Sequence, residues 1–171
     1  SLREVGARLP DFLAQRSDGA GVDGLARLER THRELFDGPD AEPLTLEGLR
    51  GLAPEAFLAL SVQLIPCHAL LAHRPAWSTV WERLGAGDTG EPDAHAEVVL
   101  VWRHGFAVRH RPVEDRAEQA MLERAVAGAT LGELCEAFVA ASPPSADGAA
   151  LAGQAFTALA RWVDDGLLTR R

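Results

Sequence analysis

The sequence has 171 residues, 47% of them hydrophobic, and this size and composition fit one folded domain with a substantial core. It carries 25 acidic and 17 basic residues for a net charge of −8, which disfavours nonspecific binding to nucleic acid. No apolar run approaches the roughly 20 residues that a membrane-spanning helix needs. The two cysteines, Cys67 and Cys135, stand far apart in apolar surroundings, which predicts reduced thiols and a cytoplasmic location.

The first third of the chain, residues 1–56, is predicted to be helical. Apolar residues at spacings of three and four predict an amphipathic helix over Ser1–Gln15, which a proline interrupts. Asp23 is placed to cap the next helix, GLARLERTHRELF, and Thr45 to cap a short one. This part therefore supplies helices and no strand.

A turn at 53–55 leads into a segment that alternates between two faces, Phe57–His73. Its alternation is typical of strands, and Pro66 divides it into two extended pieces. A helix through the same residues is the competing interpretation, but Pro66 would break it. The residues that alternate on one face are Leu58, Leu60, Val62 and Leu64.

A helix is expected to begin at Pro75 and to end near Gly85. Trp77 and Trp81 fall on one face of it, at helical spacing. Aromatic residues at this spacing pack into a core more often than they contact a partner. The tryptophan pair is kept as a candidate surface for a partner protein.

The segment EVVLVWRHGFAVRHR, residues 97–111, predicts a β-hairpin. Val98–Trp102 is an unbroken apolar run, typical of a strand buried on both faces. His104 and Gly105 are expected to form the turn, because both tolerate left-handed backbone angles. On the return strand two sets of side chains point to opposite faces: Phe106, Val108 and His110 on one, and Ala107, Arg109 and Arg111 on the other.

Three helices are expected after the hairpin, over residues 115–128, 130–141 and 151–165. The order of elements predicts an α+β fold, with a small antiparallel sheet covered on one face by helices. The chain is expected to form one domain over 1–171, with a helical part at 1–56 and a part with the sheet and the last helices at 57–171.

The sequence contains no motif that predicts catalysis or metal binding. Among the histidines and cysteines, Cys67, His68 and His73 form the only close cluster, and their spacing matches no zinc motif. His104 and His110 are expected in turn and surface roles. No nucleophile motif or phosphate-binding loop occurs. We therefore expect a non-catalytic chain that holds no metal of its own.

The arginines of the hairpin predict a binding surface. Arg103, Arg109 and Arg111 lie on a sheet that must have edges, and an exposed edge can take up an extended peptide as an additional strand. The alternative is that these arginines only keep a polar face soluble.

Four segments resemble the C-terminal domain of the HvfC/BufC family, a family long labelled as DNA-binding. It includes the small partner subunit of the methanobactin synthase. The similarity covers nearly the whole chain from about Val5, although the N-terminal helical domain of longer members is missing. The matching segments are VDGLARLER (22–30), LSVQLIPCHALLAHRPAWSTVWE (60–82), VVLVWR (98–103) and ALARWVDDGLL (158–168).

This resemblance implies a partner subunit for an iron-dependent oxidative enzyme, a TIM barrel with two or three non-haem irons. Such pairs modify ribosomally made precursor peptides, and the small subunit engages the leader of the peptide. The resemblance also implies a fold similar to peptide-binding winged-helix modules, with the iron ligands in the enzyme and no cofactor in this chain. We accordingly expect a leader-binding edge near Trp102, Arg103, Phe106, Arg109 and Arg111, and an enzyme-facing surface at Trp77 and Trp81.

Two other functions remain possible from the sequence alone. A winged-helix DNA-binding protein would bind duplex DNA with a steep dependence on salt. An enzyme with an unrecognised site, at Cys67, His68 and His73, would bind metal or turn over substrate in isolation.

Overall fold

A computed structural model of the chain describes residues 6–16, 21–87, 91–144 and 147–171. The chain divides into two compact units, each built from two segments. Unit 1 comprises Ser1–Gly38 and Ala69–Pro112, and unit 2 comprises Pro39–His68 and Val113–Arg171. The predicted boundary between residues 56 and 57 does not coincide with this division. Both units combine helices with a small sheet, which confirms the α+β class.

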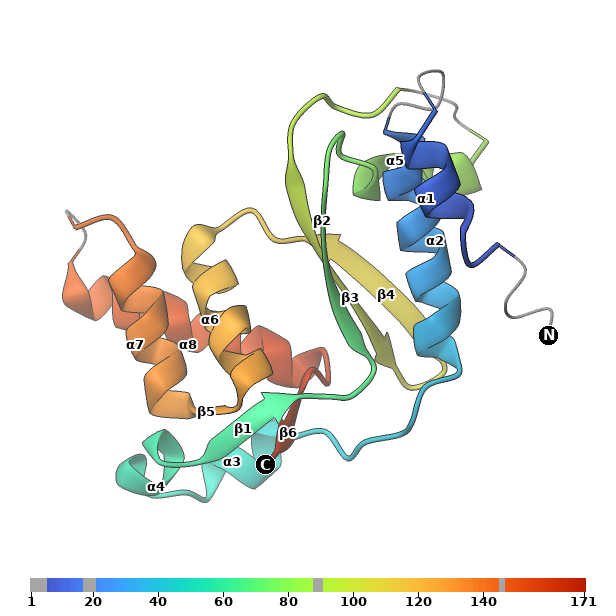
Figure 1. The fold of residues 1–171 in the computed structure, drawn as a ribbon. Helices are drawn as coiled ribbons and strands as arrows, with labels where there is room; N and C mark the ends of the chain where they lie inside the picture. The colour runs from blue at the N-terminus through green and yellow to red at the C-terminus, as the bar shows by residue number, and fades with distance from the viewer. Residues whose placement is uncertain (1–5, 17–20, 88–90, 145–146) are drawn as a thin grey trace. The chain divides into compact units, whose positions relative to one another are not determined.

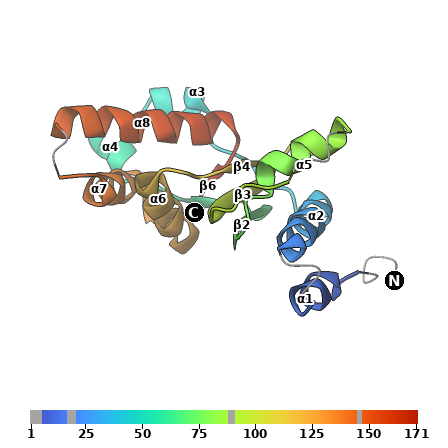
Figure 2. The same ribbon diagram turned by 90° about the horizontal axis from the view of Figure 1, so that it is seen from above.

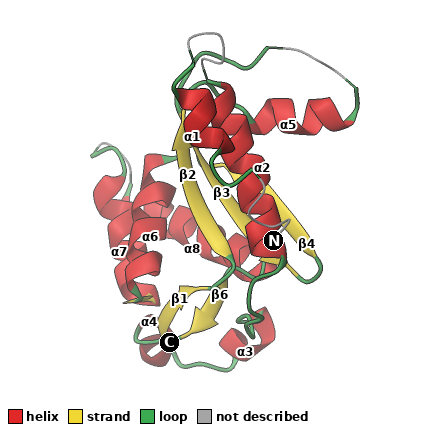
Figure 3. Ribbon diagram, turned by 45° about the vertical axis from the view of Figure 1, so that its right-hand side comes forward, coloured by secondary structure: helices red, strands yellow, loops and turns green. Residues whose placement is uncertain are grey.

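Unit 1 is a three-stranded sheet with helices packed on it (Figure 1). The strand order is β2-β3-β4, and β3 pairs antiparallel with β4 (Figure 3). Helix α2 lies against β3 and β4, and α1 packs on α2 (Figure 2). The elements are α1 (Leu9–Ala14), α2 (Val22–Phe36), β2 (His68–His73), α5 (Ser78–Gly85), β3 (Glu97–His104) and β4 (Ala107–Pro112).

The start of α2 differs from the prediction. Asp23 was expected as the cap, but the residue before the helix is Gly21, which has a left-handed φ of 89°. Asp23 lies in the first turn instead, where its Oδ2 is 3.6 Å from Nε of Arg27. A glycine takes this φ without strain, so the chain enters the helix two residues earlier. The first five residues of the predicted Ser1–Gln15 helix lie outside the described part, and α1 covers Leu9–Ala14.

The core of unit 1 lies between α2 and the sheet. Leu28 of α2 packs with Val99 and Val101 of β3, and all three are fully buried. The hydrophobic side chains packed around them are those of Leu35, Leu71, Trp81 and Val108. The apolar run of the predicted central strand therefore forms the centre of unit 1, as its sequence indicates.

Unit 2 places its helices around a second three-stranded sheet, of order β5-β1-β6. The central strand β1 pairs antiparallel with both neighbours. Helices α6 and α7 pack side by side, and α8 packs on α7 (Figure 2). The elements are α3 (Leu46–Arg50), α4 (Pro54–Leu58), β1 (Ser61–Leu64), α6 (Arg116–Ala127), β5 (Ala129–Thr130), α7 (Leu131–Ala141), α8 (Gly148–Asp164) and β6 (Leu168–Arg170).

Two predictions for unit 2 were wrong. A turn at 53–55 followed by a strand from Phe57 was expected, but Pro54–Leu58 forms helix α4. Proline fits the first turn of a helix, where its missing N–H costs nothing, and this preference outweighed the alternating pattern. A single sheet was expected, whereas β5 and β6 build a second one with β1. The division of the predicted strand at Pro66 is confirmed.

Three of the expected helix caps are confirmed, whereas the helices expected from Pro75 and from Leu151 begin at Ser78 and at Gly148. Thr45 caps α3 by accepting a hydrogen bond from the Gly48 N–H at 3.1 Å. Thr130 and Glu133 form a reciprocal capping box at the start of α7, and Gly128 ends α6 with a φ of 77°. Among the described residues, no helix is both long and apolar enough to cross a membrane.

Candidate functional site

The β3–β4 hairpin turns one residue later than its sequence suggested. His104 pairs with Ala107, so the two turn residues are Gly105 and Phe106. The φ of Gly105 is 60°, which glycine adopts without strain. Phe106 was expected on a strand face, but it stands at the tip of the hairpin and is 96% exposed. An aromatic side chain so fully exposed is a strong candidate for a contact residue.

The two faces of the hairpin differ in chemistry. The face toward α2 carries Val99 and Val101, which belong to the core. On the opposite face Leu100 pairs with Arg111 and Trp102 pairs with Arg109. The predicted alternation along the return strand is thus confirmed from Ala107 to Arg111.

The five residues predicted to bind a peptide do not form one accessible surface. Trp102 is only 3% exposed. Arg103 is half-buried, and its Nη1 lies 3.4 Å from the main-chain oxygen of Phe36, to which it donates. Arg111 is half-buried and donates to the oxygen of Pro112 at 3.4 Å. Phe106 and Arg109 are exposed and are the accessible members of the set.

The hairpin is a basic segment of an acidic chain. No acidic residue occurs between Glu97 and Glu114, whereas this stretch contains three arginines and two histidines. The chain as a whole has a net charge of −8. The exposed Arg109, in a segment without carboxylates, favours an acidic ligand on a molecule that is otherwise negative.

The tryptophans predicted to face an enzyme pack within unit 1. Trp77 precedes α5 and donates its ring N–H to the main-chain oxygen of Gly21 at 2.5 Å. Gly24 of α2 lies so close that an added Cβ would stand 3.0 Å from Cδ1 of Trp77. Trp81 packs against the core of unit 1. Both rings are half-buried, so each leaves only part of its surface for a partner.

A cluster of two histidines and a tryptophan joins α2, α5 and β4. Nε2 of His32 lies 3.1 Å from Nδ1 of His110, and Nε2 of His110 lies 3.2 Å from the main-chain oxygen of Ser78. The ring of Trp81 stacks on His32 at 4.9 Å between centroids. Burial lowers the pKa of His32 to about 4, and repulsion from His110 adds to the effect. His32 is therefore neutral at physiological pH.

A buried carboxylate caps α5. Oε1 of Glu97 accepts hydrogen bonds from the N–H groups of Trp77 at 2.6 Å and Ser78 at 2.9 Å. Its Oε2 accepts one from the Ser78 hydroxyl at 2.6 Å, and Nδ1 of His73 lies 3.5 Å from Oε1. The serine bonds to the carboxylate rather than to the histidine and is 2% exposed, so the group lacks the order of a hydrolytic triad. It holds the start of a helix in place.

Cys67, His68 and His73, which the sequence offered as a candidate metal site, contact different partners. The Cys67 thiol donates to the oxygen of Pro39 at 3.1 Å, and Nδ1 of His68 lies 2.5 Å from the oxygen of Ile65. His73 turns its Nδ1 toward Pro75 and Glu97. Within the described ranges, no three histidine, cysteine or acidic side chains gather in a way that could hold a metal ion.

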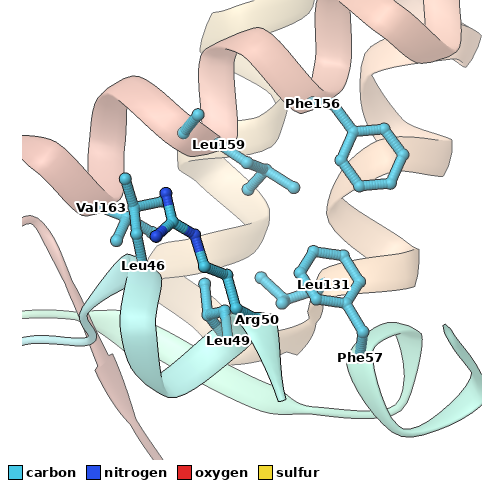
Figure 4. A pocket seen from close by; sticks show the side chains of 9 residues that line it. Leu46, Leu49, Arg50, Phe57, Leu131, Phe156, Leu159 and Val163 are labelled. Atoms are coloured by element: carbon cyan, nitrogen blue, oxygen red, sulfur yellow. The ribbon is translucent and has the colours of Figure 1, made fainter. Parts of the chain in front are cut away.

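Unit 2 contains an open apolar pocket of about 210 Å³. Figure 4 shows Phe57 and Phe156 on one side of it and Arg50 on the other. The two phenylalanine rings stack with 5.6 Å between centroids. The lining residues come from α3, α4, α7 and α8: Leu46, Leu49, Arg50, Phe57, Leu131, Phe156, Leu159, Ala160 and Val163.

The pocket and the histidine pair could not be predicted from the sequence, for different reasons. His32 lies at helical spacing from Leu25 and Leu28, on the apolar face of its helix, and His110 was predicted on the same strand face as Val108. The face on which each histidine lies was therefore a signal that the sequence offered. Nothing in the sequence indicated that the two faces meet. The pocket joins short helices to residues about a hundred positions later in the chain, and no local pattern reports such a contact. No family model and no curated protein matches the chain.

Proposed function

We propose that this chain is a non-catalytic partner subunit that binds a ribosomally made precursor peptide and presents it to an iron-dependent oxidative enzyme. The observation that supports this most is the position of β4. It is the outermost strand in the order β2-β3-β4, so among the described residues it has a partner strand on one side only. An open edge of this kind accepts an extended peptide through main-chain hydrogen bonds.

The register of the hairpin predicts which main-chain groups would bind the peptide. A two-residue turn joins the main chains of His104 and Ala107, and hydrogen-bonded pairs then alternate along the strands. On this pattern Val108 and His110 direct their N–H and C=O groups away from β3. They are the main-chain groups that an added strand would use.

The charge of the hairpin favours an acidic peptide. Arg109 is exposed, and the segment between Glu97 and Glu114 contains no acidic side chain. Phe106 at the tip adds an apolar contact beside these cations. A leader peptide with acidic residues and at least one apolar residue would match both features.

The sequence resemblance supplies the enzyme in this proposal. Members of the HvfC/BufC family accompany iron enzymes, and in those pairs the irons belong to the enzyme. A subunit that holds the leader keeps the rest of the peptide near the irons, which raises its local concentration without new contacts at the reacting residue. The role of this chain is then positioning, and the chemistry takes place in the partner.

The first experiment is co-purification. We expect this chain to elute in a stoichiometric complex with an iron enzyme of the kind that the resemblance implies, and the precursor peptide to be modified only when both proteins are present. Elution of the chain alone, together with salt-dependent binding of labelled duplex DNA, would instead support a DNA-binding protein.

A second experiment tests the edge. Val108→Pro removes one outward N–H and keeps the pairing with β3, because an edge strand tolerates proline where its N–H faces solvent. The side chain of Val108 packs against the core of unit 1, so circular dichroism must verify that this variant is folded. It should weaken binding of a fluorescent leader peptide, and so should the double change Arg109→Glu, Arg111→Glu. The matched control is Arg116→Glu, an exposed charge reversal in unit 2. If Val108→Pro and the double variant bind the leader as tightly as the control does, there is no peptide site at β4.

A further inference from the structure

The pocket of unit 2 combines an apolar interior with one charged residue. Eight of the nine lining residues are aliphatic or aromatic, and the ninth is Arg50, in the last turn of α3. Figure 4 shows the Arg50 side chain along one wall, opposite the rings of Phe57 and Phe156. Apolar pockets with a single well-placed polar group are typical binding sites, and the polar group orients what enters.

The guanidinium of Arg50 is available to a ligand. No hydrogen bond or ion pair joins it to any residue within 6–16, 21–87, 91–144 or 147–171. Other cations of unit 2 are engaged: Arg161 donates to Glu118 at 2.5 Å, and Arg171 donates to the main-chain oxygen of Gly128 at 3.2 Å. An arginine beside apolar walls favours a carboxylate, because guanidinium and carboxylate can form two parallel hydrogen bonds.

The rim of the pocket is apolar and accessible. Phe156 is 48% exposed and Leu46 is 38% exposed, and both line the pocket. Adjacent exposed apolar side chains around an opening are characteristic of a surface that another chain covers.

The volume indicates the size of the group that enters. About 210 Å³ corresponds to roughly seven heavy atoms at the volume that a water molecule occupies in the liquid. One aromatic or large aliphatic side chain fills this space. The volume of the pocket lies below the roughly 300–1,000 Å³ of sites that enclose a whole small molecule. A side chain can enter while the chain that carries it stays on the apolar rim.

We propose that this pocket binds a peptide segment of a partner protein in which a large apolar residue stands next to a carboxylate. The apolar side chain enters between Phe57, Phe156 and Leu159. The carboxylate, from an Asp or Glu side chain or from a chain terminus, pairs with Arg50. This site lies within unit 2 and does not depend on the hairpin of unit 1, so it extends beyond the function proposed above.

The test is a peptide-library selection on the full-length chain. Random heptapeptides displayed on phage are selected on the wild type, on Arg50→Glu and on the control Arg116→Glu, with circular dichroism to verify that each variant is folded. Wild type and control should enrich peptides with Phe, Trp or Leu adjacent to Asp or Glu. Peptides selected on Arg50→Glu should no longer be enriched in Asp or Glu at that position and should be enriched in Lys or Arg instead.

A titration makes the result quantitative. The most enriched peptide should bind Arg50→Glu at least about tenfold more weakly than the wild type, the loss expected for one charge-assisted hydrogen bond. Phe156→Ala should weaken binding as well, whereas Val139→Ala, an exposed apolar change on α7 outside the pocket, should leave it unchanged.

Three outcomes would overturn the proposal. One is a selection that enriches no common motif. Another is a motif whose binding is the same for Arg50→Glu and Phe156→Ala as for the wild type. The third is binding of decanoate that requires Arg50 when no peptide is enriched, because it would assign the pocket to a free carboxylic acid.

Discussion

Among the residues that the structure describes, each unit buries one carboxylate, and the two carboxylates are held by different kinds of donor. Glu97 of unit 1 accepts hydrogen bonds from two main-chain N–H groups and one hydroxyl at the start of α5. Glu118 of unit 2 is 4% exposed and accepts from the side chains of Arg161 at 2.5 Å and Trp162 at 2.8 Å. Burying a carboxylate is unfavourable without such donors, and both sites supply more than one.

The difference between the two sites determines how much stability would be lost if each carboxylate were removed. Main-chain N–H groups at the start of a helix cannot move away when their acceptor is removed. The guanidinium of Arg161 is half exposed and can turn to water instead. Glu97 is therefore expected to matter more for stability than Glu118, although both are buried and both accept from more than one donor.

The largest expected effect is that of Glu97→Ala. It leaves two helix N–H groups and the Ser78 hydroxyl without their acceptor, at about 1–3 kcal/mol for each buried unsatisfied group. Because water can partly replace the lost acceptor, we expect the free energy of unfolding, measured by urea denaturation, to fall by about 3 kcal/mol. Amide hydrogen exchange should quicken first in α5 and β3.

Glu97→Gln is the matched control, because its amide oxygen can still accept from the helix N–H groups. It should recover at least half of the lost stability. If Glu97→Ala and Glu97→Gln both stay within about 0.5 kcal/mol of the wild type, the carboxylate does not anchor α5.

The corresponding change in unit 2, Glu118→Ala, should cost less, about 2 kcal/mol. Its main effect is to leave the buried ring N–H of Trp162 without this acceptor. Arg161→Ala should cost about 1 kcal/mol, because it removes one donor to the buried Glu118 carboxylate, but water can enter the half-exposed position of the guanidinium and donate in its place. Urea denaturation followed by tryptophan fluorescence measures both. A larger loss for Arg161→Ala than for Glu118→Ala would reverse this ranking.

Acidification should affect unit 1 through His32. Its pKa in the folded chain is about 4, below the ordinary value of 6.5, because of burial and the neighbouring His110. Between these two values the unfolded chain binds a proton that the folded chain does not, so stability falls as the pH drops from about 6.5 toward 4. Since His32 is only half-buried, we expect a contribution of about 1–2 kcal/mol.

His32→Phe isolates this contribution, because phenylalanine can keep the stacking on Trp81 and does not titrate. The difference in unfolding free energy between wild type and variant should change with pH across this window and stay constant above it. Parallel curves for the two proteins from pH 7 to pH 4 would show that His32 does not cause the pH dependence.

The two sheets show how much of the fold the sequence could predict. The β3–β4 hairpin has a long apolar strand, a glycine at its turn and pairing between neighbours in the chain, so local patterns predict it. The second sheet joins residues 61–64 to 129–130 and 168–170, in strands of four residues or fewer. Strands so short carry almost no periodicity, and their pairing depends on contacts far apart in the sequence.

The same contrast between local patterns and distant contacts applies to the candidate sites. The arginines and Phe106 could be named from the sequence because the hairpin places them by alternation. Their accessibility could not, because Trp102 and Arg109 pair across the strands, yet one is buried and the other exposed. The turn was placed one residue too early, because His104 and Gly105 both tolerate left-handed angles, whereas in the structure only Gly105, the first turn residue, adopts one.

The smallest effect on stability is expected for Phe106→Ser. The side chain is 96% exposed, so replacing it removes almost no burial, and the unfolding free energy should stay within about 0.5 kcal/mol of the wild type. If the hairpin binds a peptide, the same change should weaken leader binding several-fold, as measured by fluorescence anisotropy. Val126→Ser on α6, 53% exposed in unit 2, is the control for loss of an exposed apolar side chain. Equal leader affinity for the two variants would exclude the hairpin tip from the peptide site, while weaker binding by Phe106→Ser alone would separate binding from stability at a single residue.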